Sequence, residues 1–102
     1  VSGTAPIGDD GATVGVGDPY RQTQRCLELI TAAIDELAHG RGAVLVRSRV
    51  YLVDPGDWQE VARAHGESFS QAPPASTFVV VAGLLDPAWR VEIEAEAVLR
   101  SS

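Results

Sequence analysis

The spacing of apolar side chains changes several times along this chain, and the changes fall at turns rich in glycine or proline. From Pro19 to about Gly40 apolar residues recur every three or four positions, which predicts a helix. Asp18 is a good N-cap, and Pro19 suits the first helical position because its missing N–H is not needed there. Residues 1–17 predict a short strand followed by a turn-rich segment.

The next segment alternates instead. From Ala43 to Val53 every second residue is apolar, which predicts a strand with one apolar face. Asp57 and Glu60 then have the spacing of a capping box that opens a second helix. The inward positions expected in the strand are Val44, Val46, Ser48, Val50 and Leu52, and those expected in the helix are Trp58, Val61, Ala62, His65 and Phe69.

Two further strands are predicted in the last third of the chain. Thr77 to Leu85 is apolar on both alternating faces, which is typical of a strand in the middle of a sheet or against another subunit. The last strand alternates apolar residues, from Val91 to Ala97, with a row of glutamates. The order strand, helix, strand, helix, strand, strand predicts an α+β fold with two helices packed on one face of a mixed sheet.

Length and charge limit the classes of protein. The chain has 102 residues, which predicts one domain over residues 1–102. A domain of this size buries only about 65% of the surface of its unfolded chain, so burial of further surface between subunits would stabilise it. Fourteen acidic and eight basic residues give a net charge of −6, without a basic run. These charges predict neither a nucleic acid nor a membrane as a partner.

The few cysteines and histidines predict no metal site and no cofactor. A single cysteine, Cys26, excludes an internal disulfide and is expected to be a core thiol in a reducing, cytoplasmic compartment. His39 and His65 have no second histidine or cysteine at ligand spacing. We expect His39 near the helix C-terminus and His65 packed with a hydrogen-bonded ring. No apolar run approaches the roughly 20 residues that cross a bilayer.

The glutamate row is the one candidate for catalysis that the spacing offers. Glu92, Glu94 and Glu96 lie two apart on one strand face, about 7 Å from each other. Such a carboxylate in a cleft can serve as general acid or base, whereas on an open face it is solvated or paired with Arg47 or Arg49. Serines without a histidine at recognisable spacing, Ser2 and Ser76, are not predicted to be nucleophiles.

Several segments taken together resemble the RidA family, also called YjgF or the reactive intermediate deaminase superfamily. They are Val1-Ser2-Gly3 with Pro6, Gln22-Thr23, Arg47 to Leu52 with Asp54, Asp57-Trp58 with Val61 and Phe69, Pro74 to Thr77, and Val91 to Ala95. The resemblance covers nearly the whole chain, and its closing segment is the most specific. It implies a chorismate mutase-like fold and a homotrimer with ligand clefts between subunits. It also implies a first N-terminal strand that this sequence lacks.

The resemblance further implies a site. Family members that hydrolyse enamines and imines carry a Pro-Ala-Arg segment, whose arginine binds the substrate carboxylate bidentately. Here that position is Ser76, and Phe78 replaces a small polar residue two positions on. Glu92 matches the acidic residue that positions the hydrolytic water, and Gly3 matches a backbone position of the cleft. The resemblance thus implies Glu92 as the catalytic residue and Gly3, Ser76 and Phe78 as ligand-binding residues.

Our leading hypothesis is a homotrimer that binds a small metabolite between its subunits and is not an arginine-dependent 2-iminoacid deaminase. The first alternative is an imine or enamine deaminase, a hydrolase of altered specificity in which Glu92 orients water. The second is a structural or interaction trimer. Whether the protein is an enzyme stays open at this point. Ribonuclease activity, also associated with the family, fits least because the chain is acidic.

Overall fold

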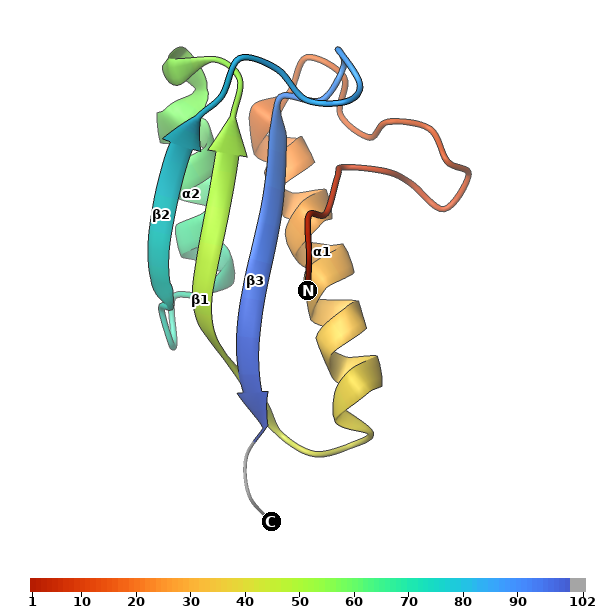
Figure 1. Ribbon diagram of the computed structural model, residues 1–102, viewed down its shortest axis with the longest axis vertical. Coiled ribbons are helices and arrows are strands. Elements are labelled where there is room, and N and C mark those ends of the chain that lie inside the picture. The colour runs from red at the N-terminus through yellow and green to blue at the C-terminus, as the bar shows by residue number, and fades with distance from the viewer. Residues whose placement is uncertain (100–102) are drawn as a thin grey trace.

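The computed structural model describes residues 1–99. The elements are α1 (Pro19–Ala38), β1 (Ala43–Leu52), a short 3-10 helix (Pro55–Asp57), α2 (Trp58–Ser68), β2 (Ala75–Val80) and β3 (Val91–Leu99). The strands form one sheet in the order β2-β1-β3, in which β1 runs parallel to β2 and antiparallel to β3. Both helices lie on the same side of the sheet (Figure 1). The predicted α+β arrangement of two helices on one face of a mixed sheet is therefore confirmed.

Helix α1 has the predicted ends. The Asp18 side chain accepts a hydrogen bond from the backbone nitrogen of Arg21 at 3.0 Å, and Pro19 occupies the first helical position. At the other end His39 is the C-cap and adopts a left-handed backbone conformation, with φ of 50°. Gly40 follows with φ of 81°, so the chain leaves the helix axis directly after Ala38.

A bulge in β1 corrects the predicted face of that strand. The register with β3 shifts between Leu45 and Arg47, which leaves Val46 without a partner. One extra residue reverses the alternation of side chains. Leu45 therefore packs against the core, whereas Val46, expected inside, is 40% exposed. Beyond the bulge the prediction is confirmed, since Ser48, Val50 and Leu52 are buried.

Asp57 does not cap α2, so the predicted capping box is wrong. The Asp57 carboxylate accepts two hydrogen bonds from the Arg90 guanidinium, from Nε at 2.8 Å and from Nη2 at 2.9 Å. Glu60 pairs with Arg63 instead. Because a bidentate guanidinium engages both oxygens of Asp57, the backbone N–H groups of the first helical turn do not receive them. The ion pair joins the start of α2 to the residue just before β3.

Strand β2 lies at the edge of the sheet, and the predicted central position is wrong. It ends at Val80, and all six of its residues are exposed in the single chain. The central position belongs to β1. After the strand, the backbone nitrogen of Val81 donates to the carbonyl oxygen of Leu52 at 2.8 Å, and a loop follows up to β3. Cover by another subunit, the other option for this apolar segment, stays a prediction.

Residues 1–4 pair with the outer edge of β3. Thr4 and Ile93 exchange both backbone hydrogen bonds, at 2.8 and 3.1 Å. Val1 and Ala95 likewise exchange two, at 2.7 and 2.9 Å. The short strand predicted at the start of the chain thus takes the form of isolated backbone bridges. This pairing places Gly3 alongside β3.

The core fills the space between the helices and the sheet. It consists of Cys26, Leu27, Ile30, Val50, Leu52, Val61, Val91, Ile93 and Ala95. Burial raises the pKa of the Cys26 thiol to about 12, and the negative charge of Glu92 acts in the same direction. Cys26 is therefore the core thiol that the sequence predicts. In the described part of the chain, neither helix combines the length and apolarity needed to span a membrane.

Candidate functional site

Gly3 and Glu92 lie together, at the outer edge of β3. A Cβ atom on Gly3 would lie 2.8 Å from Oε2 of Glu92 and 3.3 Å from its Cδ, so only glycine lets the carboxylate approach this closely. Glu92 is half-buried. Within residues 1–99 no hydrogen bond or ion pair engages its carboxylate. Its oxygens can therefore accept hydrogen bonds from a ligand or a water.

Ser76 and Phe78 lie apart from this pair. They share the helix-facing side of β2, where the Ser76 hydroxyl meets buried Ser48 and the Phe78 ring meets the ring of His65. Strand β1 separates β2 from β3. One chain therefore does not bring the four predicted site residues together, and a cleft that contains all of them requires residues from two chains.

A hydrogen-bonded group of Ser48, His65 and Ser76 joins three elements. Ser48 Oγ lies 2.8 Å from His65 Nε2 and 2.8 Å from Ser76 Oγ, and Ser76 Oγ lies 3.4 Å from the same ring nitrogen. The three side chains lie at different depths below the surface. Ser48 is 1% exposed and His65 is 7% exposed, whereas Ser76 is exposed. The fold thus places a histidine beside Ser76, although no histidine stands at recognisable spacing from it in the sequence.

Sequence spacing missed this group because its members come from β1, α2 and β2. The parallel register pairs Ser48 directly with Ser76, and α2 lays His65 over that pair. One signal was present in the sequence. Ser48 and His65 both stand at inward positions of otherwise apolar patterns, and a buried polar side chain requires a partner.

Apolar surroundings favour the uncharged form of the His65 imidazole. The rings of Phe69 and Phe78 pack edge-on against it, with centroids at 4.9 and 5.7 Å. Burial lowers the pKa of His65 below its ordinary value. The neutral ring has one acceptor nitrogen and one donor nitrogen, whose assignment depends on the tautomer. The prediction of a packed, hydrogen-bonded His65 is confirmed.

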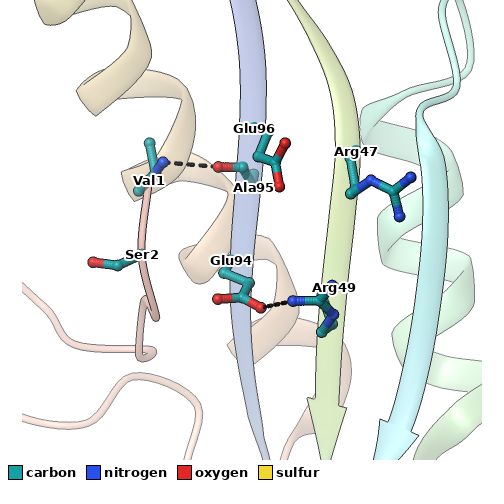
Figure 2. Close-up of a pocket in the computed structure, with 7 residues that line it drawn as sticks. All are labelled: Val1, Ser2, Arg47, Arg49, Glu94, Ala95 and Glu96. Carbon is teal, nitrogen blue, oxygen red and sulfur yellow. Dashed lines mark hydrogen bonds and ion pairs between the residues drawn. The ribbon is translucent and has the colours of Figure 1, made fainter.

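A polar pocket of about 240 Å³ lies on the open side of the sheet (Figure 2). Its lining consists of Val1, Ser2, Arg47, Arg49, Glu94, Ala95 and Glu96. Glu94 accepts hydrogen bonds from the Tyr51 hydroxyl and the Arg49 guanidinium. These two bonds lower the pKa of the Glu94 carboxyl, the Tyr51 bond most. For this member of the glutamate row, the ion-pair interpretation is confirmed.

The second arginine of this pocket, Arg47, forms no ion pair with the described residues. Arg47 and Glu96 are partners in the strand register, yet no ion pair joins them, and within residues 1–99 the Arg47 guanidinium has no acidic partner. Figure 2 shows its side chain directed away from Glu96. Over the same residues, no group of three or more histidine, cysteine or acidic side chains is placed to hold a metal ion.

An apolar groove of about 420 Å³ runs between the start of α2 and β2. It is lined by Leu52, Pro55, Trp58, Ala62, Phe78 and Val80. Trp58, which the sequence places on the same face of this helix as Val61 and His65, is exposed in the groove. The helix-facing side of β2 therefore combines a polar end at Ser76 with an apolar continuation at Phe78.

Comparisons with known proteins give consistent matches. The family model described as Endoribonuclease L-PSP matches residues 1–99. An uncharacterised protein of Streptomyces coelicolor is 38% identical over 97 residues, which cover 95% of this chain and 71% of that protein. A RutC family protein of Haemophilus influenzae is 31% identical over 74 residues. That match covers 72% of this chain but only 63% of the relative, so the chain spans less than two thirds of it.

A solved structure agrees with these sequence matches. It is a Mycobacterium tuberculosis protein described as a member of the YjgF/YER057c/UK114 family. The structures superpose with a TM-score of 0.76 at 32% sequence identity. The superposition covers 98% of this chain and 76% of the other.

Proposed function

Since this chain belongs to the Endoribonuclease L-PSP family, which is the YjgF/RidA family, we propose that it binds a small metabolite in clefts between the subunits of a homotrimer. The observation that carries the proposal is the position of the two half-sites. Gly3 and Glu92 lie at one edge of the sheet, and Ser76 and Phe78 lie at the other. Copies that meet head to tail would join the halves, and repetition of such a contact closes a ring.

The side chain at position 76 argues against a carboxylate anchor in this cleft. The Ser76 hydroxyl is neutral and already engaged with Ser48 and His65. It cannot replace the planar, charged fork with which an arginine holds a carboxylate. Glu92 would repel a ligand carboxylate brought close to it. We therefore propose a ligand that carries no carboxylate at this point, and no arginine-dependent 2-iminoacid deamination.

The proposal is tested with two small probes that differ in charge. Pyruvate has the carboxylate of the family's imino acids, and methyl pyruvate has a neutral ester in its place. We expect the protein to bind methyl pyruvate at least as tightly as pyruvate, measured by titration calorimetry. The variant Ser76→Arg should reverse this order and favour pyruvate by about tenfold or more, because it restores a charge-assisted, bidentate contact.

The unchanged protein and Ser76→Arg also test whether the protein deaminates 2-imino acids. Freshly generated 2-aminoacrylate should release ammonia no faster with the unchanged protein than in buffer, and faster with Ser76→Arg. Tight, pyruvate-selective binding by the unchanged protein would contradict the proposal. So would a deamination rate that Ser76→Arg does not improve. Thr77→Arg, which places the same charge on the opposite face of β2, is the matched control and should change neither result.

A second candidate is an imine or enamine deaminase of altered specificity, favoured by the state of Glu92. Its carboxylate is half-buried beside Gly3 and free of protein partners within residues 1–99, which suits it to orient a water. If deamination of a less acidic imine is found, Glu92→Gln should reduce it about a hundredfold. An unchanged rate in Glu92→Gln would exclude this mechanism.

RNA cleavage, which the family model's description names, is not part of the proposal. The chain carries a net charge of −6 and no basic run. RNA-binding surfaces owe most of their affinity to clustered lysine and arginine side chains that neutralise phosphates. The charge of this chain therefore favours a small ligand over a nucleic acid.

A further inference from the structure

We propose that Ser76 is a nucleophile, activated by His65 through the hydroxyl of Ser48, that takes up the acyl group of reactive esters. The inference concerns residues of one chain only, although Ser76 and Phe78 also belong to the cleft of the proposed function, so a metabolite bound there would compete with the ester for Ser76. It also uses side chains, Ser48 and His65, to which neither the predicted site nor the proposed function gives a role.

The depth of the three groups is the first support. A serine nucleophile must reach solvent, whereas its base works best where water does not hold it in the charged form. Ser76 is exposed on the edge strand, and His65 is buried beneath it. Ser48, almost fully buried, lies 2.8 Å from both. The direct distance from Ser76 to the imidazole, 3.4 Å, is longer, so the proton path runs through Ser48.

The direction of the hydrogen bonds is the second support. In the tautomer that carries its proton on Nδ1, the neutral ring accepts at Nε2 from Ser48, and Ser48 accepts from Ser76. Phe69 and Phe78 enclose the ring and offer no competing charge. The Ser76 hydroxyl carries a single proton, so in this arrangement it donates to Ser48 and not to the Pro74 carbonyl oxygen, the alternative acceptor at 3.3 Å.

The acyl transfer balances without a further reactant. Ser76 Oγ attacks the ester carbonyl carbon while its proton passes to Ser48 Oγ and the Ser48 proton passes to Nε2 of His65. The bond between the carbonyl carbon and the leaving oxygen then breaks, and the leaving group departs as an alcohol or phenol with the proton from the imidazolium. Water then attacks the acyl-serine by the same relay, more slowly than the ester acylates it, which releases the carboxylic acid and restores the three side chains.

The apolar groove indicates the class of acyl group. Phe78 lies two residues from Ser76 on the same face of β2, about 7 Å along the strand. It lines the groove of about 420 Å³ together with Trp58 and Val80. An acyl chain on Ser76 can extend into this groove and bury apolar surface. We therefore expect esters with short apolar acyl chains to react faster than acetates.

The experiment acylates the protein with p-nitrophenyl butyrate and locates the product. The chain contains no lysine, so the usual competing target of such esters is absent from the sequence. We expect one butyryl group per chain, mapped to Ser76 by peptide mass spectrometry, and faster release of p-nitrophenol than from p-nitrophenyl acetate. Ser76→Ala should abolish the adduct. Thr77→Ala removes the adjacent exposed hydroxyl on the opposite face, and should leave the reaction unchanged.

Two further variants show whether Ser76 reacts because His65 activates it or only because its hydroxyl is exposed. His65→Gln keeps a hydrogen-bonding group beside Ser48 but cannot take up a proton, and should slow acylation about a hundredfold. Ser48→Ala should slow it as well, because only the longer direct contact remains. Circular dichroism of each variant confirms that the fold is retained. If His65→Gln loses the fold, the pH profile of the unchanged protein decides in its place.

That profile has a distinct shape for an imidazole base. The rate should rise with pH and level off near or below neutrality, because burial lowers the pKa of His65. A hydroxyl without a base would instead react faster throughout the alkaline range. Absence of acyl-Ser76, an unchanged rate in a folded His65→Gln, or a profile that never levels off would each overturn the proposal.

Discussion

Three glutamates of identical chemistry occupy one strand face, and the structure gives each a different environment. Glu94 is held by Tyr51 and Arg49, Glu92 rests against the backbone of Gly3, and Glu96 is exposed. The alternation of the sequence correctly placed all three on one face. It could not distinguish them, because their environments depend on which residues β1 and the N-terminal segment bring alongside.

The bound state of Glu94 predicts a pH dependence of stability. Hydrogen bonds from Tyr51 and Arg49 favour the ionised carboxyl, so its folded-state pKa lies below its unfolded-state pKa. The resulting stabilisation is fully present above the unfolded-state pKa and is lost as pH falls through the folded-state value. Glu94→Gln should therefore flatten the acid limb of the unfolding free energy, measured by urea unfolding between neutral and acidic pH.

The matched control for this experiment is Glu96→Gln. Glu96 lies two residues along the same face and forms no ion pair within residues 1–99. Its variant should retain the acid limb of the unchanged protein. Equal slopes in all three proteins would show that the contacts of Glu94 do not contribute to folding.

For the helices and strands, features that depend on neighbouring residues in the sequence were predicted correctly. Features that depend on contacts with distant residues were not. The ends of α1 followed from Asp18, Pro19 and the turn at Gly40, all of which act within a few residues. The bulge at Val46 and the loss of the cap at Asp57 depend on partners in or next to β3, far along the chain. The contact between Ser76 and His65 likewise depends on residues far apart in the sequence, because β1 and α2 bring them together. The spacing of residues in the sequence therefore could not predict the surroundings of Ser76.

Two glycines test how backbone conformation affects stability, one inside helix α2 and one just after helix α1. Added Cβ atoms at Gly66 and at Gly40 would both meet open space. Gly66 lies inside α2, where alanine is favoured by about 1 kcal/mol, so Gly66→Ala should raise the melting temperature by about 4–8 °C. Gly40 has φ of 81°, which strains any L-residue, so Gly40→Ala should lower it. Thermal unfolding followed by circular dichroism measures both, and a fall in Gly66→Ala would contradict this account of α2.

For the whole molecule, the distribution of apolar surface is uneven. Both helices cover one side of the sheet, residues 1–4 cover the outer edge of β3, and β2 is left as the exposed edge. Phe78, Val79 and Val80 are all exposed there. Contiguous apolar surface on a small domain marks a site of association. This is the physical basis on which we expect copies of the chain to assemble.

The expected assembly can be measured directly. Light scattering at micromolar concentration should give about three times the chain mass of 10.8 kDa. Val80→Lys places a charge on the exposed edge strand and should lower the mass to that of one chain. Val16→Lys makes the same change at an exposed position outside the sheet and should leave the assembly intact. A mass near 10.8 kDa for the unchanged protein would contradict the homotrimer.

The backbone pairing of Val1 with Ala95 joins positions 94 residues apart, and this has a consequence for synthesis. A chain that emerges from the ribosome exposes residues 1–4 long before their partner strand exists. Gly3 cannot meet Glu92 until β3 has been made, so their contact is among the last parts of the fold to form. Until then the unpaired strands are open to aggregation.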